Sequence, residues 1–279
     1  MFLDLKNALK IAKQKHFAIG AFNVFDLESV KAVAEAAKEA SAPVIIQTTP
    51  KAIEYAGLNQ LFDIIKNEIH SLGVRAAIHL DHGEDFGLAK SCIDIGYNSV
   101  MIDGSKLDFE ANKHITKKVV QYAKEFDVQV EAELGAIGRK IGEGEYPAKK
   151  LTNPNLVDKF IAMTQIDSLG ISVGNAHGAP KGEKVDFDLL AEIGSKTEIP
   201  LVMHGSSGLS EQEIKMAIKY GVAKFNIDTN LRKAFIREIS HQKGISDPRD
   251  IMKKIMSAQK NVAKHYIKLL GSEGKYEEV

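Results

Sequence analysis

The sequence has little of several features that mark whole classes of protein. Cys92 is the only cysteine among 279 residues, which excludes a framework of intrachain disulfides and is typical of a reducing cytoplasm. Basic and acidic residues number 37 each, so the formal net charge is zero. The chain also has no long basic run and no basic face, which argues against binding to duplex nucleic acid or to an anionic membrane.

No apolar run approaches the roughly 20 residues that a membrane-spanning helix needs. Residues 1–6 lack the basic start and apolar centre of a secretory signal peptide. We therefore expect a soluble, cytoplasmic protein. Its apolar content of 44% is ample for a large core, and α/β barrels of this length are commonly one domain. Residues 1–279 are expected to form a single domain.

Short β-forming runs alternate with amphipathic helical patterns along the whole chain. Helix starts are indicated at Asp26, at Asn153-Pro154 and at Ser210, which has Glu213 at capping-box spacing. Eight strands are predicted, at 17–24, 43–49, 75–81, 99–103, 128–134, 168–174, 200–204 and 224–228. Eight strand–helix units predict a parallel α/β sheet closed into a (β/α)8 TIM barrel, with the active site at the rim formed by the carboxyl ends of the strands. The alternative is an open doubly wound sheet, but no Gly-x-Gly-x-x-Gly follows the first strand.

Three predicted strands each deliver a histidine that is followed by glycine, namely His82, His177 and His204. Three neutral imidazoles with one open position suit a catalytic zinc ion that polarises a substrate carbonyl. A single such histidine would be better explained as a hydrogen-bonded strand end, but three in succession favour a metal site. Asp81, next to His82, could move a proton to or from substrate oxygen, or could orient a ligand imidazole.

The loops after the last two predicted strands indicate a phosphate site, because barrels frequently bind phosphate there with backbone N–H groups. The candidate residues are Gly205, Ser206 and Ser207 after the seventh strand and Asn226, Ile227, Asp228 and Thr229 at the end of the eighth. Gly178 and Lys181, after the sixth strand, could add a close backbone approach and a positive charge.

Polar residues end other predicted strands as well. Glu131 and Glu133 share one face of their strand by its two-residue period, and Asp103 ends the preceding strand. These carboxylates could contact a second metal position or the substrate, or they could be buried polar anchors. Asn23 and Thr49, at the ends of the first two strands, are suited to hydrogen-bonding a sugar hydroxyl.

A carbonyl-polarising metal, an acid–base carboxylate and a phosphate cradle together describe enolate chemistry on a phosphorylated ketose. No predicted strand ends in a lysine placed for a Schiff base, which agrees with metal chemistry. A metal hydrolase or sugar-phosphate isomerase on the same fold is one alternative. A silent protein with a structural metal is another, although Cys92 is the only thiol that could contribute to a closed site.

The motifs together resemble those of the class II, zinc-dependent ketose-bisphosphate aldolases of the fructose and tagatose type, over essentially the whole chain. The motifs are His-Leu-Asp-His-Gly at 79–83, Ser-Val-Met-Ile-Asp-Gly-Ser at 99–105, Glu-Ala-Glu-Leu-Gly at 131–135, Gly-Asn-Ala-His-Gly at 174–178, His-Gly-Ser-Ser-Gly at 204–208 and Asn-Ile-Asp-Thr at 226–229. The resemblance implies cleavage of a ketose 1,6-bisphosphate into dihydroxyacetone phosphate and glyceraldehyde 3-phosphate.

The resemblance also implies roles for particular positions. His82, His177 and His204 would bind Zn²⁺, Asp81 would be the proton donor, and Asp103 and Glu133 would contact the metal in an alternative position. Gly178, residues 205–207 and residues 226–229 would hold dihydroxyacetone phosphate. A monovalent cation, K⁺ or Na⁺, is expected near the phosphate, and the protein is expected to be a homodimer or homotetramer.

Two departures from the family pattern concern the part of the site that receives the aldehyde. Gly138 is followed by Arg139 and a lysine rather than by a second glycine, and the arginine expected shortly after Asp-Pro-Arg at 247–249 is absent. Arg139, Lys253 and Lys254 are the candidates to replace it. The departures raise the alternative of a different aldehyde, unphosphorylated or acidic. The polar, glycine-rich segment 138–150 is expected to be either a mobile lid or an ordinary solvated loop.

Overall fold

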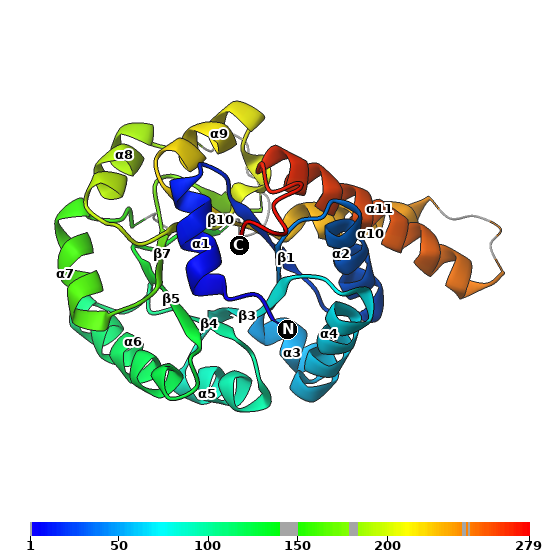
Figure 1. Cartoon of the computed structure of the whole chain (residues 1–279), viewed down its shortest axis with the longest axis horizontal. Coiled ribbons are helices and arrows are strands. Elements are labelled where there is room, and N and C mark those ends of the chain that lie inside the picture. The colour runs from blue at the N-terminus through cyan, green and yellow to red at the C-terminus, as the bar shows by residue number, and fades with distance from the viewer. Residues whose placement is uncertain (1, 140–149, 179–183, 242–243, 245) are drawn as a thin grey trace.

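The computed structural model describes residues 2–139, 150–178, 184–241, 244 and 246–279. Within them, eight parallel strands close into a barrel in the order β1-β10-β9-β7-β5-β4-β3-β2 (Figure 1). The barrel strands are β1 (Ile19–Asn23), β2 (Val44–Thr48), β3 (Ala76–Gly83), β4 (Ser99–Ile102), β5 (Gln129–Leu134), β7 (Ser168–Ile171), β9 (Leu201–Met203) and β10 (Val222–Ile227). The predicted barrel is confirmed, and every predicted strand overlaps one of these eight.

Helices that follow the strands cover the outside of the barrel, as Figure 1 shows. They are α2 (Leu27–Glu39), α3 (Pro50–Ala56), α4 (Leu58–Leu72), α5 (Phe86–Ile95), α6 (Phe109–Lys124), α7 (Pro154–Thr164), α8 (Phe187–Ser195), α9 (Glu211–Lys219), α10 (Thr229–Ser240) and α11 (Pro248–Leu269). Asp26 and Ser210 cap α2 and α9 with capping boxes, and Asn153 caps α7, as predicted. In Figure 1 the far ends of α10 and α11 project from the side of the barrel. No helix in the described part of the chain is long and apolar enough to cross a membrane.

An additional helix, α1 (Leu5–Gln14), lies across one end of the barrel (Figure 1). The sequence analysis did not identify it. The helix is amphipathic, and Leu5 and Leu9 on its buried face join a small core with Ile19, Ile45 and other residues of the barrel strands. Apolar side chains therefore fill this end of the barrel. The candidate polar site lies at the opposite rim, where the strands end.

A second small sheet lies outside the barrel, where β6 (Gly138–Arg139) pairs in parallel with β8 (Ala176–His177). The prediction that the sixth strand runs to residue 174 and delivers His177 at its end was therefore wrong in detail. β7 stops at Ile171, and His177 lies in β8, a separate element. Most of the expected lid, residues 140–149, lies outside the described residues.

The side chain of Asn175 accounts for the early end of β7. Its Oδ1 atom accepts a hydrogen bond from the Val173 backbone N–H at 2.9 Å, and its Nδ2 atom donates to the His204 carbonyl at 2.7 Å. Gly174, which lies between Val173 and Asn175, has a φ angle of 104°, in the region that favours glycine. The chain therefore turns away from the barrel ladder and approaches the end of β9.

The packing of α1 against the end of the barrel leads to a prediction about stability. Leu9 is 1% exposed, so we expect Leu9→Ala to lower the free energy of unfolding by about 2–5 kcal/mol through lost burial and the cavity left behind. Met216, on α9, is 42% exposed, and Met216→Ala should change that free energy by no more than about 0.5 kcal/mol. Urea denaturation measures both. Equal losses in the two variants would show that α1 is not part of the cooperative core.

Candidate metal centre and catalytic rim

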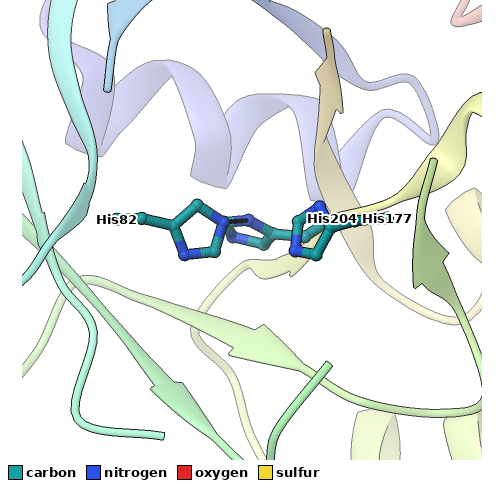
Figure 2. A group of neighbouring side chains, drawn as sticks. All are labelled: His82, His177 and His204. Carbon is teal, nitrogen blue, oxygen red and sulfur yellow. Dashed lines mark hydrogen bonds between the residues drawn. The ribbon is translucent and has the colours of Figure 1, made fainter. Parts of the chain in front are cut away.

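The structure brings His82, His177 and His204 together, and one ring nitrogen from each lies within 4.8 Å of the others. His82 Nε2 and His204 Nδ1 are 3.1 Å apart. Figure 2 shows the three imidazoles gathered around one region, and each pair of rings meets edge to face. Three nitrogen donors that converge in this way can hold a divalent ion such as zinc.

The backbone of β3 is distorted where it delivers two functional side chains in succession. Neighbouring residues of a regular strand point to opposite faces, so Asp81 and His82 would normally diverge. The pairing of β3 with β4 shifts register between Leu80 and Gly83, and His82 has a left-handed φ of 52°. This bulge lets both side chains face the site, with Asp81 Oδ1 at 3.9 Å from His82 Nε2.

Two more carboxylates adjoin the histidines. Asp103 Oδ2 is 2.8 Å from His82 Nδ1, and His82, Asp103 and Glu133 form a second set of groups whose ligand atoms lie within 4.8 Å. The Ile137 N–H donates to Glu133 Oε1, but the buried Oε2 atom finds no hydrogen-bond partner among the described residues. An unpaired buried carboxylate oxygen beside converging imidazoles fits a cation site.

The electrostatics of this cluster also favour a positive ion. Burial and the neighbouring Asp103 raise the pKa of Glu133 to about 8. Burial lowers the pKa of His82, but Asp81 and the hydrogen bond with Asp103 outweigh it and raise that pKa to about 9. A cation at this point would balance the surrounding carboxylates, so the donor set fits a divalent metal with His82 shared by both groups of ligands.

Asp81 is held by two amide side chains. Asn23 Nδ2 donates to its Oδ2 atom at 2.8 Å and Asn226 Nδ2 donates to its Oδ1 atom at 2.9 Å. Gln47, which the sequence analysis missed, donates to Asn23 Oδ1 at 2.8 Å and so fixes the orientation of that amide. Burial would raise the pKa of Asp81, but nearby positive charges, His82 first, lower it to about 2. Asp81 is therefore a carboxylate at rest.

The loops proposed for phosphate binding lie beside each other at the rim. Gly205 leads into a short 3-10 helix, η1 (Ser206–Gly208), which contains Ser207. Ser206 Oγ donates to the Asn226 carbonyl at 2.9 Å and ties this turn to the end of β10. Thr229 begins α10 immediately afterwards. The end of β10, which leads into α10, therefore lies beside η1, and the first N–H groups of a helix have no partner within the helical pattern.

The other candidates for substrate contact are placed less uniformly. Gly178 follows β8 with a φ of 91°, and Ile227 is the buried last residue of β10. Asp228 accepts hydrogen bonds from Arg232, and Thr49 Oγ1 caps α3 by accepting from the Ala52 N–H at 3.2 Å. The hydroxyl of Thr49 therefore already has a structural partner. Lys181 lies outside the described residues.

Two of the candidates to replace the missing arginine, Lys253 and Lys254, lie on α11 and away from the histidines, whereas the backbone of Arg139 pairs with that of His177. Lys253 Nζ lies 3.2 Å from Asp250 Oδ1 on the surface of α11. Lys254 lines a groove of about 670 Å³ between α10 and α11, which none of the three histidines lines. Arg139 lies in β6, at the edge of the described residues.

Two fully buried charged residues stand behind His204. Glu131 Oε1 is 2.9 Å from His204 Nε2, and Lys224 Nζ donates to Glu131 Oε2 at 2.7 Å. Burial raises the pKa of Glu131, but the charge of Lys224 outweighs it, so the pKa lies below its ordinary value. The sequence analysis named Glu131 only as a candidate carboxylate and missed Lys224. The signal that could have found it is a charged residue within the run 222–227, which is otherwise a buried strand.

Comparison with known proteins adds to this geometry. The family model described as fructose-bisphosphate aldolase class-II matches residues 3–275. A fructose-bisphosphate aldolase of Staphylococcus epidermidis is 36% identical over 281 aligned positions, which cover 98% of each protein. The YdjI aldolase from Escherichia coli K12 superposes with a TM-score of 0.89 at 31% identity, over 99% of this chain and 100% of that one. A fructose-bisphosphate aldolase from Campylobacter jejuni, at 24% identity, shares the fold with a TM-score of 0.83 over 97% and 95% of the two chains.

Gly205 offers a test of how the histidines are brought together. A Cβ atom built there would lie 2.4 Å from the carbonyl oxygen of Ala176, which precedes His177, and the residue has a left-handed φ of 65°. We expect Gly205→Ala to push this segment away from His204, which weakens zinc binding and lowers the free energy of unfolding.

Gly73 provides the matched control, because it has the same φ of 65° but nothing within 4 Å of an added Cβ. Gly73→Ala should cost only the conformational strain of about 1–2 kcal/mol and leave zinc affinity unchanged. Urea denaturation and chelator competition measure the two quantities. Equal effects of the two substitutions on zinc affinity would contradict the role given to the Gly205 contact.

Proposed function

Because the chain belongs to the class II fructose-bisphosphate aldolase family, we propose that it reversibly cleaves a ketose 1,6-bisphosphate, of the fructose or tagatose type, into dihydroxyacetone phosphate and glyceraldehyde 3-phosphate. Aldolases of this class are metal-dependent lyases that act on phosphorylated sugars. The observation that carries the proposal is the convergence of His82, His177 and His204 beside the carboxylate of Asp81.

We propose that these three histidines hold Zn²⁺, with Asp103 and Glu133 as ligands of an alternative position. When bound, the ion would supply a Lewis acid for the ketone oxygen and the enediolate. The support for this assignment is the chemistry of the donor set, the unpaired Glu133 oxygen and the family's dependence on a divalent metal.

Asp81 is proposed as the group that moves the proton. In the cleavage direction its carboxylate takes the proton from the C4 hydroxyl while the C3–C4 bond breaks, and in the reverse direction it returns the proton to the aldehyde oxygen. Hydrogen bonds from Asn23 and Asn226 hold both carboxylate oxygens in place. The lowered pKa of Asp81 keeps its side chain ionised, so that it has an oxygen free of a proton when the cleavage begins.

The phosphate of the ketose is proposed to bind at the rim loops. Backbone N–H groups of residues 205–207 and 226–229 would donate to it, with Gly178, directly after β8, and Lys181, which lies outside the described residues, as further candidates. The support is that the Ser206 hydrogen bond ties η1 to the end of β10, directly before α10. A monovalent cation, K⁺ or Na⁺, is proposed near this phosphate.

We also propose that residues 1–279 act as one domain, in the cytoplasm, within a homodimer or homotetramer. The exposed apolar side chains of Ile236 and Ile239 on α10, 60% and 48% exposed, support an interface at the projecting end of α10. The single, buried Cys92 agrees with a reducing compartment.

A class II aldolase that takes a different, unphosphorylated aldehyde is the second candidate. The observation that favours it is the absence of the expected arginine after residues 247–249, together with the ion pair of Lys253 with Asp250. A metal-dependent isomerase or hydrolase remains the alternative from another enzyme class.

One assay separates these functions. Release of dihydroxyacetone phosphate is measured from fructose 1,6-bisphosphate, tagatose 1,6-bisphosphate and fructose 1-phosphate, before and after chelation and after zinc return. We expect cleavage of a bisphosphate, loss of activity on chelation and recovery with zinc. The reason is that the three imidazoles would hold the ion, and the ion would polarise the ketone. A higher kcat/KM for fructose 1-phosphate would select the unphosphorylated aldehyde. Conversion of the sugar without C–C cleavage would select the isomerase.

Asp81→Asn tests the proton transfer. The amide cannot accept the proton, so we expect kcat to fall by about 10²–10⁴-fold while zinc content and fold are retained. Steady-state kinetics and metal analysis measure the two effects. Asp94→Asn, at an exposed site paired with Lys90, is the matched control and should leave kcat unchanged. An Asp81→Asn enzyme with normal kcat would rule out this carboxylate as the acid–base group.

A further inference from the structure

The interior of the barrel contains an ion pair that the reaction does not use directly. Lys224 Nζ lies 2.7 Å from Glu131 Oε2, and both side chains are fully buried. Removing two charges from water is unfavourable, and such pairs are often no more stabilising than apolar residues of similar volume. The position of this pair, directly behind His204, points to a role other than stability.

The chemistry of the two charged groups fixes the direction of the hydrogen bond to His204. A lysine ammonium only donates hydrogen bonds, and a carboxylate only accepts them. With Glu131 held as an anion by Lys224, its Oε1 atom at 2.9 Å must accept from His204 Nε2. The Nε2 atom therefore carries the proton of the neutral ring, and the lone pair lies on Nδ1.

The groups on the other side of the ring agree with this assignment. His204 Nδ1 is 3.1 Å from His82 Nε2, among the converging nitrogens, and 3.0 Å from Asn226 Nδ2. The same Asn226 nitrogen donates to Asp81 Oδ1, so it is a donor toward both neighbours. An Nδ1 atom without a proton can accept a hydrogen bond from this amide.

Lys224 also donates a hydrogen bond to His79, on the side away from the proposed metal site. Lys224 Nζ is 3.1 Å from His79 Nε2, so that nitrogen accepts and the proton of His79 lies on Nδ1, which is 2.6 Å from Ser99 Oγ. Ser99 then donates to Gln129 Oε1, and Gln129 Nε2 donates to Ser168 Oγ at 2.7 Å. Every hydrogen bond of this buried chain runs in one direction from the ammonium, which locks Lys224 in place.

We propose that Glu131, held as an anion by Lys224, is a positioning residue that fixes the Nε2–H tautomer of His204 and so leaves Nδ1 as its metal-binding atom. The inference rests on the proposed function, in which His204 is a ligand. Carboxylates that accept from a ligand imidazole typically contribute about 10- to 100-fold to metal affinity. Glu131 would act through His204 and would not contact the substrate.

The test removes both charges together, because loss of one partner would leave a lone buried charge. In the double variant Glu131→Leu with Lys224→Met, the acceptor of His204 Nε2 is gone, and we expect zinc affinity to fall by about 10- to 100-fold. Glu131→Gln with Lys224→Met retains an oxygen that can accept the hydrogen bond, so its zinc affinity should lie closer to the unsubstituted protein. Tyr97→Phe removes a buried hydrogen bond to Thr48 in the outer core and should leave zinc affinity unchanged.

Two measurements decide the outcome. Chelator competition gives the zinc dissociation constants, and nitrogen NMR of isotope-labelled histidines in the metal-free protein shows which nitrogen of His204 carries the proton. We expect Nε2–H in the unsubstituted protein and in the Tyr97→Phe control, and a mixture of tautomers in the leucine variant.

Nδ1–H on His204 in the unsubstituted protein would overturn the proposal, whether or not the double variants fold. Equal zinc affinity in the leucine variant and the unsubstituted protein, or an equal loss in the glutamine and leucine variants, would overturn it as well. A protein that binds no zinc at all but shows the Nε2–H tautomer would instead overturn the metal centre of the proposed function. The two failures are therefore distinguishable.

Discussion

The site depends on one electrostatic constraint. The fold holds imidazole nitrogens with lone pairs and negatively charged carboxylates so that they face one another. Three imidazole nitrogens lie within 4.8 Å, and the carboxylates of Asp81, Asp103 and Glu133 surround them. Such an arrangement is unfavourable unless a positive charge occupies its centre. The same constraint raises the pKa values of two groups: burial and Asp103 raise that of Glu133, and Asp81 and Asp103 raise that of His82, because a proton on either group reduces the local negative charge. The apolar core between barrel and helices provides the stability that keeps these groups together.

Departures from regular strand geometry are what make the convergence possible. The left-handed backbone at His82 turns two consecutive side chains toward the site, and the Gly205 position lets the backbone before His177 approach β9. The sequence analysis assigned Gly205 to phosphate binding. The backbone of Ala176 lies where a Cβ atom of this residue would stand, so this glycine also serves the assembly of the site.

The periodicity of the sequence was sufficient to predict the eight strands, the closed barrel and the rim at which polar residues gather. Local pattern determines these features, because buried parallel strands are apolar runs that end in polar residues. Features that depend on neighbours across the barrel were not predictable in this way. Contacts between residues far apart in the chain determine four such features: the packing of α1 against the barrel, the β6–β8 pairing, and the roles of Gln47 and Lys224. Lys224 in particular lies in the middle of a strand, whereas the sequence analysis looked for chemistry at strand ends.

Asp81 and Glu131 have different surroundings in the barrel, and this difference separates the roles that we propose for them. Asp81, at the rim, receives hydrogen bonds from the neutral amides of Asn23 and Asn226, which orient it without cancelling its charge. Glu131, in the interior, is paired with the ammonium of Lys224 and is fully buried. A carboxylate that keeps its charge next to the substrate position can exchange a proton during the reaction. A carboxylate that is neutralised by a fixed cation and shielded from substrate can only hold its neighbour in one tautomer. The two environments thus support the roles that we propose, proton transfer for Asp81 and positioning for Glu131.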